Sequence, residues 1–399
     1  MLSSCLKKMK SINTLWQLLL SSFVVLSVAA CGTGASSAKS GEKGTDTTKS
    51  YWKGGIVTDE FIYDTAPFPS CHAATIAETP AGMVVSFFGG TKERNPDVEI
   101  YVSRQVNGKW TAPVSVANGI QNDTLRYPTW NPVLYQVPGG DLLLFYKIGP
   151  KPSAWKGWMI RSKDNGLTWS APKALPEGFL GPIKNQPVLL ADGKTLLCPS
   201  STEDHGWHVH IEKTTDFGKT WTMTGPIDNG QFQGAIQPTI LVHPDHRIQL
   251  LCRSKDRAIL ESWSSDNGNS WTPLARTNLP NNNSGIDAVS LKNGSFALVY
   301  NHVIPPAGKA KGARTPLNLA VSKDGENWDA AAILEDSPIS QYSYPTIIQA
   351  SDGKLHVVYT WRRKKIKHAV IDPQQLKTLP IKDSIWPPVK GYVPPVPQK

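Results

Sequence analysis

The sequence has 399 residues and a formal net charge of +10, with 42 lysines and arginines against 32 acidic residues. A basic face favours an anionic ligand such as an acidic glycan, although lysines scattered over a surface are the commoner explanation of such a charge. The chain has no P-loop, no zinc-finger spacing and no arginine-rich arm. Composition and motifs therefore argue against a nucleic-acid-binding protein.

The chain begins with lysines that lead into an apolar run over residues 15–30, which ends in V-A-A-C. Such a short run, closed by small residues, is typical of a signal peptide rather than a membrane span. V-A-A-C resembles a bacterial lipobox, which implies cleavage after residue 30 and a lipid on the thiol of Cys31; an ordinary signal peptide is the alternative. Gly32 follows without an acidic residue. We therefore expect a lipid-anchored protein of the bacterial cell envelope, at the outer membrane or facing the periplasm.

Residues 31–50 contain no large apolar side chain beyond Cys31, and they are expected to form a flexible tether. The folded body should begin near Tyr51. Without the signal peptide, which carries three lysines and no acidic residue, the formal charge of +10 becomes +7.

An octapeptide repeat organises the rest of the chain. Ser264–Trp271 reads S-S-D-N-G-N-S-W, and similar segments occupy Ser162–Trp169 and Thr214–Trp221. Ser322–Trp328 is one residue shorter, and Ser103–Trp110 is degraded. The pattern predicts a hairpin turn in which Asp caps the turn, Gly takes a positive φ and Trp packs under the sheet.

The tryptophans that end these segments are 59, 52, 50 and 57 residues apart, which is the spacing of propeller blades of about 40 to 50 residues with insertions. Each blade should open with a pair of apolar strands. Six such pairs are expected, over residues 70–90, 130–147, 185–200, 236–253, 285–301 and 342–361. The fold class is therefore all-β, a six-bladed β-propeller over residues 51–399. Residues 365–372 should give the last blade a third strand, and residues 55–63 should close the ring as its outer strand.

Five cysteines are present, of which Cys5 is lost with the signal peptide and Cys31 is the lipidation candidate. Cys71, Cys198 and Cys252 each lie in an apolar strand, so buried free thiols are expected.

Polar side chains gather where first strands begin and second strands end, and these positions should converge on one face of the propeller. Such side chains beside uniformly apolar strands indicate a binding mouth. The candidates are His72, Glu93, Asp97, Asn131, Lys147, Asn185, Gln237, Arg253, Asp287, Tyr342 and Tyr344.

The repeats and this distribution resemble the sialidase (neuraminidase) superfamily, six-bladed propellers with Asp-box turns, over about residues 51–372. The resemblance implies three arginines that clamp a sugar carboxylate, a tyrosine nucleophile activated by a glutamate, and an aspartate acid/base. Tyrosine suits this reaction because a carboxylate nucleophile would approach an anionic sugar with like charge.

Residue by residue, the resemblance implies roles for particular positions. I-Q-P-T-I and L-L-C-R-S resemble the strand pair that runs from the activating Glu to a clamp Arg, which gives Gln237 and Arg253. A-R-T-P-L resembles the segment of another clamp residue, Arg314. Q-Y-S-Y-P resembles the Tyr-Ser motif, which implies Tyr342 as nucleophile with Tyr344 as the alternative. A tyrosine buried against the backbone is the competing interpretation of Tyr342.

The first blade departs from the family pattern. F-P-S-C-H stands where the family has Phe-Arg-Ile-Pro, so the first clamp arginine is absent and His72 lies nearby. A satisfied core histidine and a general base that titrates near neutrality are both open for His72. The loop after F-F-G-G offers Asp97, or Glu93, as the acid/base.

Gln237 is the second departure, because an amide cannot take the proton of a tyrosine. Glu203, Glu261 and His72 are the possible substitutes. The cluster His205, His208 and His210 invites a metal site, but a solvated strand and loop is the preferred interpretation. No metal and no cofactor are expected.

Three hypotheses follow. The first is an exo-acting glycoside hydrolase that releases sialic acid or a related keto or uronic acid through Tyr342. The second is a uronate polysaccharide lyase in which His72 and Tyr342 act as base and acid, and in which Gln237 is no anomaly. The third is a lipid-anchored glycan-binding protein without turnover. The expected partners are an acidic glycan and, through Cys31, a membrane, and the protein is expected to be a monomer.

Overall fold

The computed structural model describes residues 51–399 apart from 229, 391, 395 and 397–399. The predicted signal peptide, Cys31 and the tether over residues 31–50 lie outside the described residues. The chain divides into two units, Met1–Thr45 and Asp46–Lys399, and the fold below belongs to the second. None of the helices in the described part of the chain combines the length and the apolar character that a membrane crossing requires.

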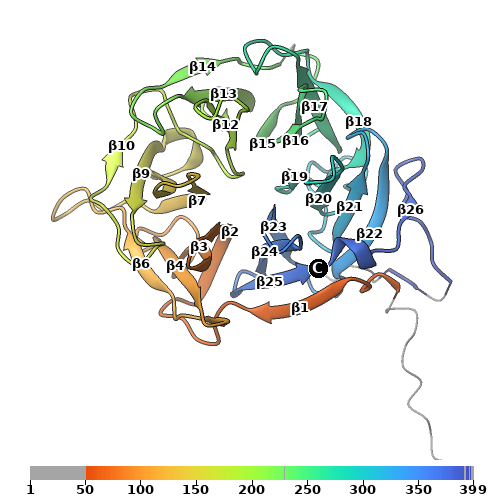
Figure 1. Cartoon of the computed structure of the whole chain (residues 1–399), viewed down its shortest axis with the longest axis horizontal. Helices are drawn as coiled ribbons and strands as arrows, with labels where there is room; N and C mark the ends of the chain where they lie inside the picture. The colour runs from red at the N-terminus through yellow and green to blue at the C-terminus, as the bar shows by residue number, and fades with distance from the viewer. Residues whose placement is uncertain (1–50, 229, 391, 395, 397–399) are drawn as a thin grey trace, which may run out of the picture. The chain divides into compact units, whose positions relative to one another are not determined.

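Six antiparallel sheets surround a common axis and form a six-bladed β-propeller (Figure 1), which confirms the predicted fold. Blade 1 contains β2 (Ser70–Thr79), β3 (Gly82–Gly90), β4 (Glu99–Val106), β5 (Lys109–Trp110) and β6 (Val114–Ala117). Blade 2 contains β7 (Thr129–Gln136), β8 (Leu142–Ile148), β9 (Lys156–Ser162) and β10 (Lys173–Ala174). Blade 3 contains β11 (Val188–Leu189), β12 (Leu196–Thr202), β13 (His208–Thr214) and β14 (Thr222–Thr224).

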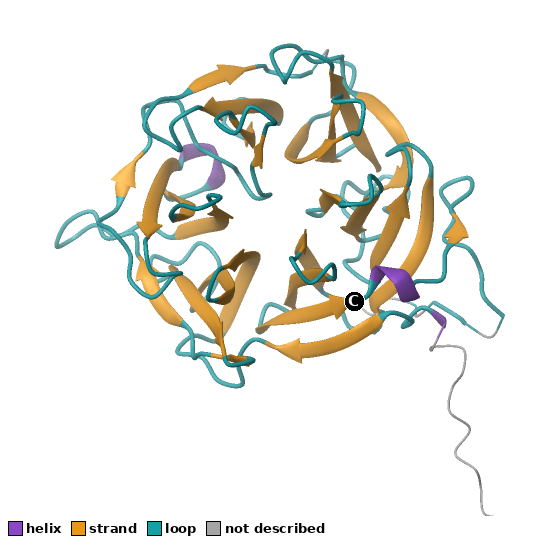
Figure 2. Ribbon diagram, in the orientation of Figure 1, coloured by secondary structure: helices purple, strands orange, loops and turns teal. Residues whose placement is uncertain are grey.

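Blade 4 contains β15 (Ala235–Val242), β16 (Ile248–Ser254), β17 (Ala258–Ser264) and β18 (Ala275–Pro280). Blade 5 contains β19 (Asp287–Ser290), β20 (Phe296–Tyr300), β21 (Leu317–Ser322), β22 (Trp328–Glu335) and β26 (Leu379–Pro380). Blade 6 contains β23 (Tyr342–Gln349), β24 (Leu355–Trp361), β25 (Lys365–Ile371) and β1 (Ile56–Phe61). Loops and two short 3₁₀ turns, η1 (Pro152–Ala154) and η2 (Pro373–Gln375), join them (Figure 2).

The core lies between the faces of neighbouring blades. One cluster joins Leu251 and Ile259 of blade 4 to Leu298 and Tyr300 of blade 5, all of them buried. Every residue of β8 and β16 is buried, because each blade is covered on both faces by its neighbours. This explains why the second strands are continuous apolar runs rather than alternating ones.

The three cysteines of the propeller are buried and unpaired, as predicted: Cys71, Cys198 and Cys252. Burial raises the pKa of the Cys71 thiol to about 12, which keeps it protonated and unreactive.

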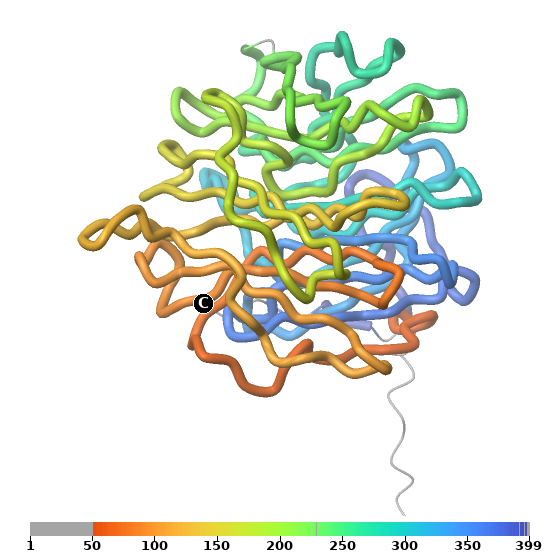
Figure 3. Tube along the Cα trace, turned by 60° about the vertical axis from the view of Figure 1, so that its left-hand side comes forward, coloured from red at the N-terminus to blue at the C-terminus, as the bar shows by residue number. Residues whose placement is uncertain are grey.

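The N-terminal strand closes the ring, as predicted. β1 pairs antiparallel with β25, and Figures 1 and 3 both draw this early segment beside the last blade. Trp52, which is 1% exposed, packs against Ala330 and Ile333 of blade 5. The first and last parts of the propeller therefore hold each other, and no sheet is left with a long open edge at the junction.

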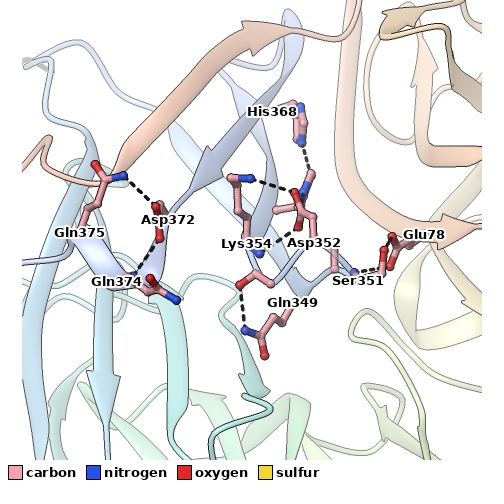
Figure 4. Close-up of polar contacts among 12 residues, drawn as sticks. Glu78, Gln349, Ser351, Asp352, Lys354, His368, Asp372, Gln374 and Gln375 are labelled. Atoms are coloured by element: carbon pink, nitrogen blue, oxygen red, sulfur yellow. Dashed lines mark hydrogen bonds and ion pairs between the residues drawn. The ribbon is translucent and has the colours of Figure 1, made fainter.

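Histidines reinforce this closure. The carboxylate of Glu60 on β1 accepts a hydrogen bond from His368 Nδ1 on β25 (3.0 Å). His368 Nε2 in turn contacts His356 Nδ1 on β24 (3.0 Å), the contact drawn as a dashed line from His368 in Figure 4. Burial lowers the pKa of both imidazoles, that of His356 to about 4. The neighbouring turn reaches blade 1, where Ser351 N donates to Glu78 Oε2 (2.7 Å). Polar contacts thus hold the last blade to its own outer strand, β1, and to blade 1.

The repeated octapeptide forms the predicted turn. In the copy on blade 4, Ser264 Oγ donates to Asp266 Oδ1 (2.8 Å) and accepts from Gly268 N (2.9 Å), while Asp266 Oδ1 also accepts from Ser270 N (2.9 Å). Gly268 has φ +73°, and Trp271 Nε1 donates to its carbonyl (3.2 Å). The hydrogen bonds from Ser270 hold the pKa of the Asp266 carboxyl below its usual value.

Ser264→Ala is expected to lower the free energy of unfolding by about 1 to 2 kcal/mol, because the buried Gly268 N–H loses its acceptor. Ser265→Ala is the matched control, since that side chain is exposed in the same turn. Urea titration of both variants measures the difference. Equal stabilities of the two variants would show that the hydroxyl of Ser264 does not hold the turn.

Bulges interrupt the innermost strands of four blades at the same place. Register shifts occur in β2, β7, β15 and β23, and each contains a non-glycine residue with positive φ: Ala73 (57°), Asn131 (34°), Gln237 (54°) and Tyr344 (54°). A bulge re-aims a side chain and is common beside functional sites. Two of these four side chains, Gln237 and Tyr344, meet in the site described next.

Candidate active site

The hydroxyl of Tyr344 is the centre of a polar cluster contributed by blades 4, 5 and 6. It accepts a hydrogen bond from Arg253 Nη1 (2.7 Å) and one from Gln237 Nε2 (3.1 Å). Arg253 is fixed in turn, because its Nη1 also donates to Gln237 Oε1 (3.1 Å) and its Nε to Asn283 Oδ1 (3.0 Å). The four side chains are at most 9% exposed. Tyr344 is therefore held in one orientation by a preorganised network.

Positive charge surrounds the ring of Tyr344. The guanidinium carbons of Arg314 and Arg253 lie 5.6 Å and 5.8 Å from its centroid, and Lys184 Nζ lies 5.9 Å away. Burial lowers the pKa of Arg314 to about 10 and that of Lys184 to about 8. The partners of the Tyr344 hydroxyl among the described residues are an arginine and an amide, neither of them an anion. Such a site is built to attract an anionic ligand.

His72 lies against Tyr344, with ring centroids 4.1 Å apart. Its Nδ1 contacts Thr360 Oγ1 (2.8 Å), while its Nε2 is buried and has no hydrogen-bond partner among the described residues. Burial, assisted by the charges of Arg363 and Arg314, lowers the pKa of His72 well below its usual value. The imidazole is therefore neutral at physiological pH, with one nitrogen free beside the tyrosine.

Glu203 follows β12 at the edge of the cluster. Burial raises the pKa of its carboxyl, and the charges of Arg253, Lys255 and Arg94 oppose that shift. Trp207 contacts the same group of cations: the guanidinium carbon of Arg253 is 5.2 Å from its ring and Lys255 Nζ is 4.3 Å from it. A partly buried carboxyl group thus stands beside the arginine that holds Tyr344.

The loop after β3 carries the other two acidic candidates. Asp97 Oδ2 accepts from Thr91 N and Thr91 Oγ1 (both 2.7 Å), and Asp97 Oδ1 is buried without a partner among the described residues. Glu93 pairs with Arg363 Nη1 (2.5 Å). Arg363 also influences His72 and Arg314 electrostatically, so this loop adjoins the cluster.

Tyr342 does not join the cluster. It is fully buried, and its hydroxyl accepts from Arg362 Nε (3.2 Å) and Nη2 (3.0 Å). The two tyrosines would share a face in a regular strand, but the bulge after Ser343 and the positive φ of Tyr344 turn them apart. The structure thus brings Tyr344, the alternative expected from the sequence, to Arg253 and Gln237 in place of Tyr342.

The remaining mouth candidates fix the framework. Asn185 Nδ2 donates to the carbonyls of Gln237 (3.1 Å) and Pro238 (3.0 Å), and its Oδ1 accepts from Lys184 Nζ (2.7 Å). Asp287 accepts from Thr239 Oγ1 and Ile347 N (both 2.9 Å).

Asn131 and Lys147 are likewise buried. Lys147 Nζ donates to the carbonyls of Pro182 and Asn131, and burial lowers its pKa to about 7. The side chains of Asn185, Asp287 and Lys147 satisfy buried backbone groups around the axis, so their polarity at strand ends reflects packing.

Two further groups lie elsewhere. Glu261 accepts a hydrogen bond from Gln249 Nε2 (2.7 Å), and the same Nε2 donates to the carbonyl of Gly325 in an Asp-box turn. Glu261 therefore lies toward the Asp-box end of the blades, away from the cluster around Tyr344. His208 pairs with Asp228 (2.6 Å), and His210 with Glu212 (3.0 Å). Among the described residues no group of three or more His, Cys, Asp or Glu side chains is arranged to hold a metal ion.

Two residues of the cluster, Trp207 and Asn283, were not among the candidates expected from the sequence. Trp207 lies in the connection between the second and third strands of blade 3, which reaches the same face as the strand ends that we considered. Asn283 lies in an N-N-N-S-G run before β19. The signal for both is their place in a connection at the same end of the blades as the polar strand ends.

Comparison with known proteins agrees with the propeller fold. A family model described as a BNR repeat-like domain matches residues 82–357. No curated protein sequence matches the chain. Solved structures do: a Dyadobacter fermentans protein of unknown function has a TM-score of 0.64 at 15% identity, over 79% of this chain and 98% of that one.

Other similar structures are named for an activity. Hadza microbial sialidase Hz136 has a TM-score of 0.64 at 16% identity, over 77% of this chain and 66% of that one. The intramolecular trans-sialidase from Ruminococcus gnavus has a TM-score of 0.62 at 12% identity, over 82% and 99%. At such identities the likeness shows the fold.

Proposed function

Because the chain belongs to the family of BNR repeat-like domains, we propose that it is an exo-acting glycoside hydrolase, which releases a terminal acidic sugar from glycans. Sialic acid or a related keto or uronic acid is the substrate class. The observation that carries the proposal is the hydroxyl of Tyr344 held by Arg253 and Gln237, with Arg314 over its ring.

In this proposal Arg253 and Arg314 bind the sugar carboxylate, and Tyr344 attacks the anomeric carbon. The Tyr344 oxygen forms a bond to that carbon while the bond to the leaving-group oxygen breaks, and Glu203 gives that oxygen a proton. Water, losing its proton to the Glu203 carboxylate, then releases the sugar. A neutral nucleophile avoids setting a carboxylate against an anionic substrate. Asp97 is the second candidate for the role of Glu203.

The proton of Tyr344 needs an acceptor, because Gln237 has no basic group. His72 supplies one: when its Nδ1–H donates to Thr360, the unpartnered Nε2 carries a lone pair. The proton passes to His72 as Tyr344 attacks and moves on to solvent, because the lowered pKa of His72 disfavours the imidazolium. Tyr344 regains a proton when the sugar leaves. In this proposal His72 thus activates the tyrosine, which is the role of a glutamate in the sialidase superfamily that the sequence resembles.

Gln237→Glu is expected to raise kcat for a 4-methylumbelliferyl sialoside by about tenfold, because a carboxylate beside the Tyr344 hydroxyl is a better placed base. Fluorophore release measures it, with Gln374→Glu at an exposed position as the control. A Gln237→Glu variant that is folded and slower than the natural protein would contradict the assignment of Tyr344 as nucleophile.

The ionisation of Glu203 should set the pH dependence of kcat/KM. Its carboxyl must be protonated to act as the acid, so kcat/KM should fall as pH rises through a pKa that burial places above the usual value of about 4.3. Glu203→Gln should lower kcat/KM by about 10²-fold at acidic pH and abolish this decline. A profile that keeps the same decline in Glu203→Gln would transfer the role to Asp97.

A uronate lyase is the second candidate, favoured by the neutral His72 with its free nitrogen beside Tyr344. A lyase abstracts a proton beside the carboxylate and leaves an unsaturated sugar, so it needs no activated nucleophile. Incubation with sialylated and uronic-acid glycans separates the two. Released acidic sugar without ultraviolet absorbance supports the hydrolase, whereas an absorbing unsaturated product would replace it with the lyase. Tight glycan binding without either product would contradict both.

A further inference from the structure

A pocket lies between blades 2 and 3, and it borders the candidate active site at Glu203. It has a volume of about 390 Å³ and a largely apolar floor made by Trp155, Leu175, Phe179 and Leu180. Glu203 stands at its edge. Nothing in the proposed chemistry at Tyr344 uses this pocket.

The pocket opens on the same face as the cluster around Tyr344. It is built from η1 in the connection between β8 and β9, from the segment after β10, and from the end of β12. These connections lie at the opposite end of the blades from the Asp-box turns, since the strands of each blade run antiparallel. Glu203 belongs to both sites: the charge of Arg253 acts on its carboxyl group, and the same residue borders the pocket.

Hydrogen bonds to Glu212 fix the loop that forms one wall of the pocket. The buried carboxylate of Glu212 accepts hydrogen bonds from Leu180 N (2.9 Å), Gly181 N (2.7 Å), Ser200 Oγ (3.1 Å) and His210 Nε2 (3.0 Å). A desolvated carboxylate is costly unless it is fully hydrogen-bonded, and here two of its bonds fix the backbone of one loop. The pocket is therefore preformed rather than created by a mobile loop.

The opposite wall is also packed. Trp155 is 8% exposed and meets Trp130 edge to face, with centroids 5.9 Å apart. Phe179 is half-buried and leans on Trp221 at 6.1 Å, which leaves part of its ring open to the pocket. Aromatic rings held in this way offer flat apolar faces to a ligand.

The charged residues at the rim of the pocket indicate which class of ligand it can bind. Glu177, Glu203 and Asp204 border the pocket against a single cation, Lys156. An anionic sugar is thus disfavoured here, in contrast to the cationic surroundings of Tyr344. A neutral sugar fits both features, because its C–H face can pack on an aromatic ring while its hydroxyls donate to the carboxylates.

We propose that this pocket binds the neutral sugar residue that carries the terminal acidic sugar, on the leaving-group side of the scissile bond. The inference rests on the proposed function, and it places Glu203 between the two sugars, next to the oxygen that it protonates. The substrate class narrows accordingly to acidic sugars attached to a neutral oligosaccharide.

Neutral disaccharides test the pocket without any turnover. Titration of the full chain with lactose, cellobiose and maltose by calorimetry should show saturable binding of at least one of them. Phe179→Ala and Ser153→Trp should weaken that binding at least about tenfold, the first by removing an aromatic face and the second by filling the pocket. Ser265→Trp, at an exposed position of an Asp-box turn, is the matched control and should bind the disaccharide as the natural protein does.

Substrate selectivity gives the second readout. Ser153→Trp should lower kcat/KM for sialyllactose at least about tenfold and leave a methyl sialoside, whose leaving group is too small to reach the pocket, unchanged. No binding of any disaccharide, or binding indifferent to Ser153→Trp, would overturn the inference. Disaccharide binding without turnover of either sialoside would instead overturn the proposed hydrolase and leave the sugar-binding pocket standing.

Discussion

Tyr344→Phe is expected to lower kcat/KM for a 4-methylumbelliferyl sialoside by at least about 10³-fold, a loss of about 4 kcal/mol in transition-state stabilisation. The phenylalanine ring keeps the contacts with His72 and Arg314 and loses only the oxygen that forms the bond to the sugar. Circular dichroism and thermal unfolding establish that the variant is folded.

Tyr342→Phe is the matched control, two residues away on the same strand. Its hydroxyl bonds Arg362 in the core, so its removal should cost about 1 kcal/mol of stability and change kcat/KM by less than about tenfold. The reverse order of the two effects would restore Tyr342 as the nucleophile and contradict the site described here.

Arg253→Ala is expected to lower kcat/KM by about 10²- to 10³-fold, with effects on both kcat and KM. KM rises because the carboxylate loses a charged ligand, and kcat falls because the Tyr344 hydroxyl loses its shortest hydrogen bond, at 2.7 Å. Arg253→Lys keeps the charge but cannot bond Tyr344, Gln237 and Asn283 together, so it should recover only part of the loss.

The control for this pair is Arg247→Ala. Arg247 forms an exposed ion pair with Asp245 (2.7 Å), and such pairs contribute little. Activity of Arg253→Ala equal to that of Arg247→Ala, in folded preparations, would show that Arg253 is a structural residue and would remove the basis of the carboxylate clamp.

The architecture could be predicted because its signals are local and repeated. An Asp-box turn needs Asp, Gly and Trp at fixed offsets, and the same offsets recur at blade spacing. The outer strand missing from the last blade led to the expectation that residues 55–63 close the ring, and β1 lies there. Apolar runs flanked by turn residues gave the six inner pairs for the same reason.

The site was less predictable because bulges break the two-residue period of a strand. Tyr342 and Tyr344 are equivalent by alternation, and only the positive φ of Tyr344 separates them. Gln237 reaches the cluster from a similar bulge on β15. The sequence carries no signal that places a bulge, so only the folded strand distinguishes the two tyrosines.

Polarity at strand ends was an ambiguous signal for another reason. Lys147, Asn185 and Asp287 satisfy backbone groups near the axis, where closely packed inner strands leave carbonyls and amides without ladder partners. Arg253 looks no different from them in the sequence, yet its guanidinium faces Tyr344. Burial and partners distinguish the two groups, and both are properties of the folded chain.

The most direct test of the central claim is covalent trapping. A sialosyl fluoride with a second fluorine beside the anomeric carbon slows hydrolysis of the glycosyl-enzyme, so the sugar should remain on the protein long enough for peptide mass spectrometry. We expect one adduct, on Tyr344. An adduct on Tyr342, or turnover of the natural substrate with neither tyrosine modified, would contradict it.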